Sequence, residues 1–264
     1  MKAVLITFII IILAGLMNNT PAQNPKVIVT AHRGASAYAP ENTIASFVEA
    51  INMKADYAEL DVQETSDGEL ILFHDKHMKR TAGLDKDVWE ASYDEVKNLD
   101  AGSWFNEKYK GEKIPKFADV IDFVKGKIKL NIELKTNGHE KALADRVVKI
   151  VKDKGFENQC IITSFDYNLV KRVKEIAPSL KVGLIFKTIP DSIDVFKINA
   201  ELLSVHFSVV NEEFVKKAKE NGKEVHVWTA NEESEMKRLI GLGVNSLITN
   251  YPDIARRIVD ESVR

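Results

Sequence analysis

The sequence predicts an α/β protein, a (β/α)8 TIM barrel with a β-hairpin at its second strand and a small insertion after that hairpin. From residue 26 onward, short runs rich in β-branched and aromatic residues alternate with amphipathic segments of helical period, several of which end in glycine. Such alternation predicts parallel strands joined by crossover helices. Because the repeat fills the chain beyond its N-terminal segment, a closed barrel is favoured over an open sheet.

Nine runs have strand character, one more than a barrel of eight strands needs. They are residues 26–31, 57–62, 69–74, 128–134, 160–165, 181–186, 201–206, 224–229 and 245–249. The second and third runs are separated only by QETSDG, which is shorter than the roughly dozen residues that a parallel crossover needs. These two runs therefore form a hairpin, with Asp67-Gly68 as a favoured two-residue turn. Pairing outward from that turn predicts that Asp61 lies opposite His74.

The clearest helical segments lie between the later strands. They are residues 142–155, 167–177, 212–222 and 232–243. A chain of 264 residues that is 45% hydrophobic can bury one large core, and nothing in it indicates a second independent domain. The barrel is predicted over residues 23–264.

Residues 75–115 interrupt the alternation of strands and helices. This segment contains several aromatic and charged residues but no clean βα unit. Insertions on barrels usually follow strand C-termini, where active sites also lie. Residues 75–115 therefore form either a lid or substrate-facing cap, or a small helical excursion with its own packing.

The N-terminus has the layout of a secretory signal peptide over residues 1–22. Lys2 precedes an apolar run from Ala3 to Met17, and small residues suit cleavage after Ala22. This predicts a periplasmic or secreted protein. The alternative is an uncleaved membrane anchor, which is the one case in which membrane contact is expected. Cys160 is a lone cysteine, so an internal disulfide is excluded and a buried packing role is expected.

Charge excludes one large class of partner. The formal net charge is −2, and lysine and glutamate are mixed along the chain without a basic stripe. Nucleic acid is therefore not an expected partner, and no stable protein partner is predicted.

Carboxylates gather where the predicted strands end. Residues two apart on a strand share a face, which places Glu59 beside Asp61 and Glu133 beside Lys135. Carboxylates that point inward near a barrel rim repel each other unless a cation compensates them. The three hard oxygen donors of Glu59, Asp61 and Glu133 suit one divalent cation, Mg²⁺ or Ca²⁺.

Two histidines and two cationic residues converge on the same end of the barrel. His32 and Arg33 close the first strand, and the hairpin brings His74 to Asp61. The histidines suit an acid/base pair at neutral pH. Arg33, as a planar fork, and Lys135, as a point charge, suit a bound phosphate.

Two further residues have two interpretations each. Glu41 follows Pro40 and suits a helix start, which is the favoured interpretation, but it can also orient Arg33. Trp228 ends a strand at the same rim, where its ring can pack on a substrate or simply on the protein.

With these residues in view, the chain resembles the glycerophosphodiester phosphodiesterase family, which is related to the phosphatidylinositol-specific phospholipase C barrels. The resemblance rests on HRGASAYAPENTIASFVEA, ELDVQETSDGELILFHD, NIELK, SF, VWTAN and ITNYPD, in that order. It implies a (β/α)8 barrel with an insertion after the FHD motif. It also implies the following roles: acid/base pair, His32 and His74; ligands of a divalent cation, Glu59, Asp61 and Glu133; phosphate binding, Arg33 and Lys135.

The resemblance further implies hydrolysis of a small glycerophosphodiester to glycerol 3-phosphate and an alcohol such as choline or ethanolamine. The nucleophile is either water or the 2-hydroxyl of the glycerol, and the sequence does not choose between them. An alternative within the same fold is a lysophospholipase D or phospholipase C-like activity on lipid-sized phosphodiesters. The residues also allow a Schiff-base enzyme that uses Lys135, or a phosphoester-binding protein without catalysis.

Overall fold

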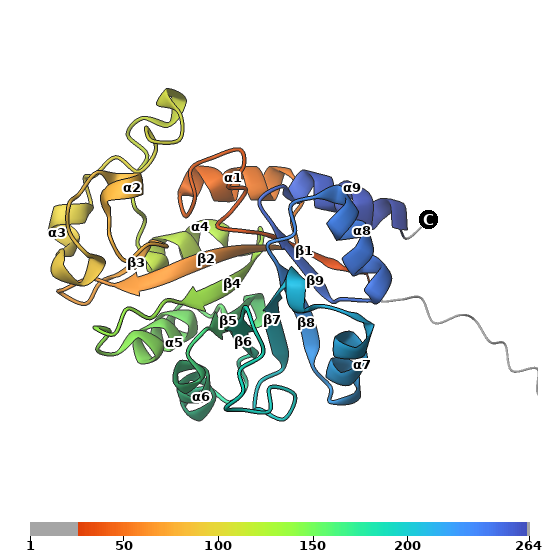
Figure 1. Ribbon diagram of the computed structural model, residues 1–264. Coiled ribbons are helices and arrows are strands. Elements are labelled where there is room, and N and C mark those ends of the chain that lie inside the picture. Colours follow the sequence, from red (N-terminus) through yellow and green to blue (C-terminus); the bar gives the residue numbers. More distant parts are fainter. Residues whose placement is uncertain (1–25, 263–264) are drawn as a thin grey trace, which may run out of the picture.

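Eight parallel strands close into a barrel in the computed structural model, which describes residues 26–262 (Figure 1). The barrel strands are β1 (Ile28–Ala31), β2 (Tyr57–Glu64), β4 (Lys129–Leu134), β5 (Cys160–Ser164), β6 (Val182–Phe186), β7 (Leu202–His206), β8 (Glu224–Trp228) and β9 (Ser246–Thr249). Parallel pairing of β1 with both β2 and β9 closes the sheet. The predicted barrel and its strands are confirmed.

Helices cover the outside of the barrel in most of the crossovers and after the last strand. They are α1 (Ile44–Asn52), α4 (Phe117–Val124), α5 (Leu143–Asp153), α6 (Tyr167–Ile176), α7 (Glu212–Glu220), α8 (Glu233–Leu242) and α9 (Pro252–Ser262). In α5, for example, Leu143, Val147 and Val151 recur at helical spacing and are buried against the sheet. The connection between β6 and β7, residues 187–201, contains no helix. No helix among residues 26–262 is both long enough and apolar enough to span a membrane.

The strands are buried on both faces, but the two faces differ in chemistry. Along β2 and β4, Leu60 and Ile132 are fully buried and belong to the main apolar core. The alternate positions are polar, and inside the barrel Thr163 donates a hydrogen bond to the side-chain carbonyl of Asn131 (3.0 Å). The period of two along each strand thus separates an apolar layer under the helices from a polar interior.

The predicted hairpin is present, but its predicted register is wrong by one residue. Strand β3 (Leu70–Leu72) pairs antiparallel with β2 and sets Val62 opposite Leu72. The Phe73 amide donates to the Asp61 carbonyl (3.0 Å), so Phe73, not His74, lies opposite Asp61. The turn has three residues, 66–68, instead of two. Gly68, at φ +87°, supplies the left-handed conformation that such a loop needs.

Residues 75–115 pack with Ile71 and Phe73 of the hairpin around a second apolar cluster, beside the extended end of β2 (Figure 1). The segment contains α2 (Lys79–Ala82), η1 (Val88–Glu90), α3 (Tyr93–Val96) and η2 (Glu107–Tyr109). Its buried side chains include Met78, Val88, Val96 and Ile114.

The predicted signal peptide, residues 1–22, lies outside the described residues, so export stays a prediction that N-terminal sequencing of the mature protein would test.

The turn after β1 is unusually tight. Arg33 and Gly34 both have positive φ, +54° and +75°, and the Gly34 amide donates to the Glu59 carbonyl (3.2 Å). A Cβ added at Gly34 would lie 2.6 Å from the Cβ of Ser46 and 2.7 Å from its backbone carbon. Only glycine therefore lets this turn pack against the start of α1.

We expect Gly34→Ala to lower the free energy of unfolding by more than Gly126→Ala, measured by urea denaturation. Both glycines have a φ of +75°, but nothing lies within 4 Å of a Cβ at Gly126. The control therefore reports only the cost of the left-handed conformation, about 1–2 kcal/mol, whereas Gly34→Ala adds a clash with Ser46. Equal losses for the two variants would contradict the packing described for this turn.

Candidate active site

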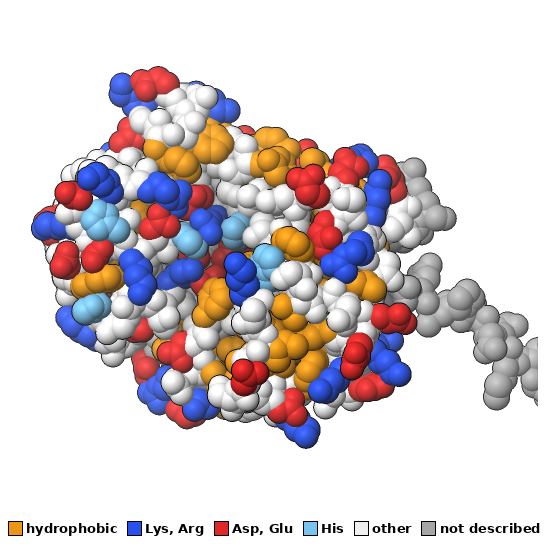
Figure 2. Space-filling model, in the orientation of Figure 1, with side chains coloured by type: hydrophobic (Ala, Val, Ile, Leu, Met, Phe, Trp, Pro, Cys, Tyr) orange, Lys and Arg blue, Asp and Glu red, His pale blue; other side chains and the backbone are white. Residues whose placement is uncertain are grey.

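A pocket of about 110 Å³ opens at the carboxyl ends of the barrel strands. Histidine, basic and acidic side chains gather around its mouth near the centre of the view in Figure 2, with an apolar area to one side. Seven of the predicted site residues line it: His32, Arg33, Glu59, His74, Glu133, Lys135 and Trp228. Asp61 is 1% exposed and lies beside Arg33 and Lys135. The structure thus brings together residues that are far apart in the sequence.

Three carboxylates form a compact buried cluster. Glu59, Asp61 and Glu133 each offer one oxygen, and these oxygens lie within 4.8 Å of one another. The pairing of β2 with β4 produces this arrangement, because it sets Asp61 directly beside Glu133, and Glu59 shares the inward face with Asp61.

The cluster carries more negative charge than its protein neighbours compensate. Burial, with the charges of Asp61 and Glu133, raises the pKa of Glu59 well above its usual range. Burial and Asp61 raise the pKa of Glu133 to about 7. Burial alone would also raise the pKa of Asp61, but Lys135 and Arg33 outweigh it and hold this pKa below its usual range. Three oxygen donors in this state fit a divalent cation.

Both predicted phosphate-binding residues contact the carboxylates. The Arg33 Nε lies 3.5 Å from Asp61 Oδ2, and the Lys135 Nζ lies 2.8 Å from Glu133 Oε1 and 3.5 Å from Asp61 Oδ1. Burial would lower the pKa of Lys135, but these carboxylates raise it. Lys135 is therefore a charged ammonium, which does not suit the neutral amine that a Schiff base requires.

The favoured interpretation of Glu41 as part of a helix start is wrong. Helix α1 begins at Ile44, with Thr43 as its N-cap. Glu41 instead accepts a hydrogen bond from Arg33 Nη1 (3.0 Å), which is the orienting contact that the sequence offered as the second interpretation.

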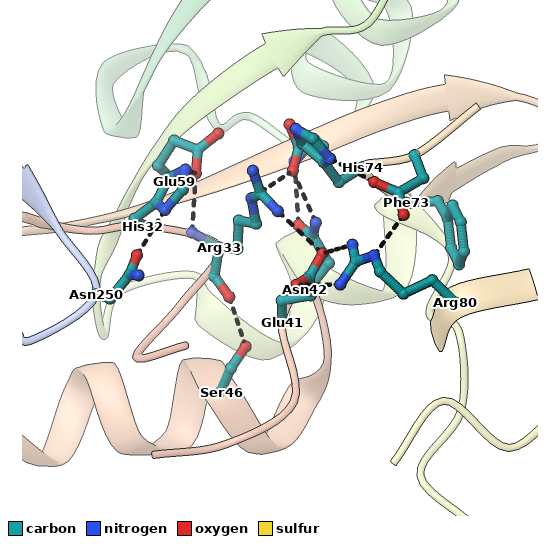
Figure 3. Close-up of polar contacts among 12 residues, drawn as sticks. His32, Arg33, Glu41, Asn42, Ser46, Glu59, Phe73, His74, Arg80 and Asn250 are labelled. Atoms are coloured by element: carbon teal, nitrogen blue, oxygen red, sulfur yellow. Dashed lines mark hydrogen bonds and ion pairs between the residues drawn. The ribbon is translucent and has the colours of Figure 1, made fainter. Parts of the chain in front are cut away.

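Each histidine is held by a polar neighbour through Nδ1. His32 Nδ1 lies 2.7 Å from the side-chain oxygen of Asn250, and His74 Nδ1 lies 2.8 Å from Asp75 Oδ1 (Figure 3). Burial, together with the charge of Arg33, lowers the pKa of His32 to about 4. Burial also lowers the pKa of His74, against the opposing effect of Asp61. Both side chains are thus oriented, and His32 is neutral at physiological pH.

Sequence reasoning missed several residues that support the site. Asn42 donates to Asp61 Oδ2 (2.8 Å) and accepts from the Asp61 amide (3.1 Å). Asn250 and Asp75 orient the histidines. Asn250 follows the last strand, and Asp75 follows His74 in the FHD motif. Their positions at strand ends could have indicated that both lie near the site. Arg80, from α2, gave no such signal.

Trp228 ends β8 at the pocket, as predicted. Its ring makes edge contacts with Phe165 and His206, at centroid distances of 5.7 and 5.2 Å. The buried Trp228 Nε1 has no hydrogen-bond partner among residues 26–262. A buried indole N–H normally finds a partner, so Trp228 contributes an unpaired polar atom behind its ring at the edge of the pocket.

The sequence profile of the glycerophosphoryl diester phosphodiesterase family matches residues 32–254. The chain belongs to this family. Among its relatives is the glycerophosphodiester phosphodiesterase of Caldanaerobacter subterraneus subsp. tengcongensis, which is 36% identical over 89% of this chain and 98% of the relative. A glycerophosphodiester phosphodiesterase of Bacillus subtilis is 32% identical over 88% of this chain and 86% of the relative.

A solved structure shows the same family fold. A phosphodiesterase of Oleispira antarctica, in complex with the product sn-glycerol-3-phosphate, matches with a TM-score of 0.84 and 30% identity, over 88% of this chain and 96% of that one. The predicted family, fold and enzyme class, a phosphoric diester hydrolase, are confirmed. A binding protein without catalysis is not supported.

We expect Asn42→Gly to lower the free energy of unfolding by roughly 2–4 kcal/mol, because it removes two hydrogen bonds to buried Asp61, one of them to the charged carboxylate. Glycine tolerates the φ of +58° at this position. Urea denaturation in the presence of a chelator measures the loss. The control, Asn211→Ala, removes a single capping bond at α7 and should cost roughly 1 kcal/mol. A smaller loss for Asn42→Gly than for the control would contradict this account.

Proposed function

We propose that this protein hydrolyses small glycerophosphodiesters to glycerol 3-phosphate and an alcohol, with one divalent cation and a pair of histidines. One observation carries the proposal: two histidines, two cations and three buried carboxylates surround a single pocket at the strand ends. The product complex of the Oleispira antarctica relative supports the substrate class.

Glu59, Asp61 and Glu133 are the residues that would hold the cation. Carboxylate oxygens suit Mg²⁺ and Ca²⁺ alike. When bound, such a cation neutralises charge on the nonbridging phosphate oxygens and so favours attack at phosphorus. The raised pKa values of Glu59 and Glu133 support this assignment, because they indicate unmet demand for positive charge.

Arg33 and Lys135 would hold the phosphate next to the carboxylates. Arg33 keeps a fixed direction because Glu41 accepts from its Nη1 and its backbone amide donates to Glu59 Oε2 (2.8 Å). A guanidinium held in this way can offer paired donors to a phosphate, and the Lys135 ammonium adds a point charge. Both would stabilise the charge that develops on the phosphoryl oxygens in the transition state.

His32 and His74 would move the two protons of the reaction. With Nδ1 of His32 held by the side-chain oxygen of Asn250, its Nε2 is the basic nitrogen, and the lowered pKa keeps it neutral. His32 therefore suits removal of a proton from the nucleophile, which leaves protonation of the leaving alcohol to His74, oriented by Asp75. The nucleophile is water or the 2-hydroxyl of the glycerol.

The size of the pocket favours a small substrate. Its volume of about 110 Å³ is below the roughly 300–1,000 Å³ usual for drug-sized ligands, so it accepts a glycerophosphate group more readily than an acyl chain. A second hollow of about 320 Å³ shares His74 and Lys135 with it, on a side lined by polar residues. Trp228 forms one wall and would place its ring against the substrate. A lysophospholipase D or phospholipase C-like activity receives less support from this geometry.

We expect the purified protein to hydrolyse glycerophosphocholine faster than lysophosphatidylcholine, with both activities abolished by a chelator. Restoring Mg²⁺ or Ca²⁺ separately should recover hydrolysis and identify the cation. Released glycerol 3-phosphate measures the first reaction and released choline measures both. Full activity in the chelator would refute the cation, and preference for the lipid would refute the substrate class.

We expect His32→Ala and His74→Ala each to lower kcat on glycerophosphocholine by about 10²–10⁴-fold, the usual contribution of a positioned acid or base. His77→Ala is the control, because His77 is exposed and lies outside the pocket. Circular dichroism verifies that all three variants are folded. If either pocket histidine could be replaced without loss of kcat, its proposed role would be wrong.

A further inference from the structure

Arg80 connects two carboxylates, Glu41 and Asp75, that come from separate segments of the chain. From α2, its Nη1 and Nη2 donate to Glu41 Oε2 (3.1 Å) and Oε1 (2.7 Å), and its Nε donates to Asp75 Oδ2 (2.5 Å) (Figure 3). All three nitrogens of one guanidinium are therefore engaged. The fork geometry of arginine makes this possible, whereas the single ammonium of a lysine could not reach both partners in the same way.

Each of these carboxylates in turn holds a residue of the pocket. Glu41 Oε1 accepts from Arg33 Nη1 (3.0 Å), and Asp75 Oδ1 lies 2.8 Å from His74 Nδ1. Arg33, Glu41, Arg80, Asp75 and His74 thus form one continuous chain of polar contacts. Its ends come from separate segments, the turn after β1 and the turn after β3.

From Arg33 to Asp75 the charges in this chain alternate, and Arg80 is the cation between its two carboxylates. Among residues 26–262, no other lysine or arginine forms an ion pair with Asp75. Without Arg80, Asp75 and Glu41 would each lose a cation, and nothing would link them. The Trp104 ring, with its centroid 5.5 Å from the guanidinium carbon, flanks Arg80 from the same insertion.

Arg80 does not line the pocket, and its side chain is 44% exposed. It therefore acts through its neighbours and not on substrate. We propose that Arg80 is a positioning residue, supplied by the insertion, that fixes the phosphate-binding Arg33 and the proton-transferring His74 relative to each other. This inference rests on the proposed function, because it assumes those roles for Arg33 and His74.

The same contacts allow a simpler interpretation, in which Arg80 forms a surface ion pair that contributes only to stability. Such pairs typically contribute about 0.2–1 kcal/mol. The two interpretations differ in what removal of Arg80 does to kinetics. A positioning residue lowers kcat on a folded enzyme, whereas a stabilising ion pair lowers the melting temperature and leaves kcat unchanged.

The test compares Arg80→Ala and Arg80→Lys with Arg172→Ala, using kcat and KM for glycerophosphocholine with the cation present. Arg172 is a matched control on α6, because its side chain is 46% exposed and also contacts two carboxylates, Asp145 and Glu175. We expect Arg80→Ala to lower kcat by about 10–100-fold, as for other outer partners of site residues, and to raise KM. Arg172→Ala should leave both constants unchanged.

Two further measurements separate positioning from stability. Added guanidinium chloride, at concentrations below those that unfold the protein, should partly restore kcat of Arg80→Ala, whereas equal sodium chloride should not. In the Asp75→Asn background, Arg80→Ala should cost less than in the wild type, because the two residues act through the same histidine. Full additivity together with absence of guanidinium rescue would overturn the proposal.

Arg80→Lys keeps the positive charge, so it tests the positioning role even if Arg80→Ala fails to fold. We expect a folded protein with reduced kcat, because lysine cannot bridge Glu41 and Asp75 together. Wild-type kcat and KM for Arg80→Lys would overturn the proposal. If His74→Ala keeps full activity, the proposed function itself fails. If His74→Ala is inactive while the Arg80 variants are unaffected, only the inference about Arg80 fails.

Discussion

The need to compensate buried negative charge governs the arrangement of this site. Glu59, Asp61 and Glu133 lie within a few ångströms of one another where little water can screen them. Like charges in such a setting destabilise the fold unless cations or protons balance them. Arg33 and Lys135 supply part of the balance, and the proposed divalent cation would supply the remainder. This excess of negative charge would attract a cation into the pocket. The bound cation, with Arg33 and Lys135, would then attract a phosphate.

The barrel supplies this arrangement through strand register. Parallel pairing of β2 with β4 places Asp61 beside Glu133, and the turn after β1 carries Arg33 over the same strand ends. That turn depends on backbone conformation, since the Arg33 and Gly34 amides reach the Glu59 side chain and carbonyl, and both residues have positive φ. A site built on strand ends and one tight turn is held more precisely than one built on long loops.

Family membership explains what the barrel does, and the supporting contacts explain how its side chains are held. The profile match covers most of the chain, and relatives at 36% and 32% identity are glycerophosphodiester phosphodiesterases. Asn42 and Asn250 each fix a side chain of the pocket through a short polar contact. The insertion packs with part of the hairpin around a second apolar cluster, and it contributes Arg80, which contacts Glu41 and Asp75 from outside the pocket. Its contacts therefore extend to the catalytic side of the barrel.

The sequence by itself determined the barrel, the hairpin and the convergence of the main site residues, because strand and helix periods, short connections and strand-end positions are local properties of the chain. Tertiary structure decided the register of the hairpin and the contacts that hold the side chains of the site. The hairpin register followed from a three-residue turn with Gly68 in the left-handed conformation, which the Asp-Gly pair alone did not reveal. The partner of Glu41 and the bridge by Arg80 join segments 8 and 39 residues apart. The first contact follows from the tight turn after β1, and the second depends on how the insertion packs against the barrel, which no periodicity in the sequence encodes.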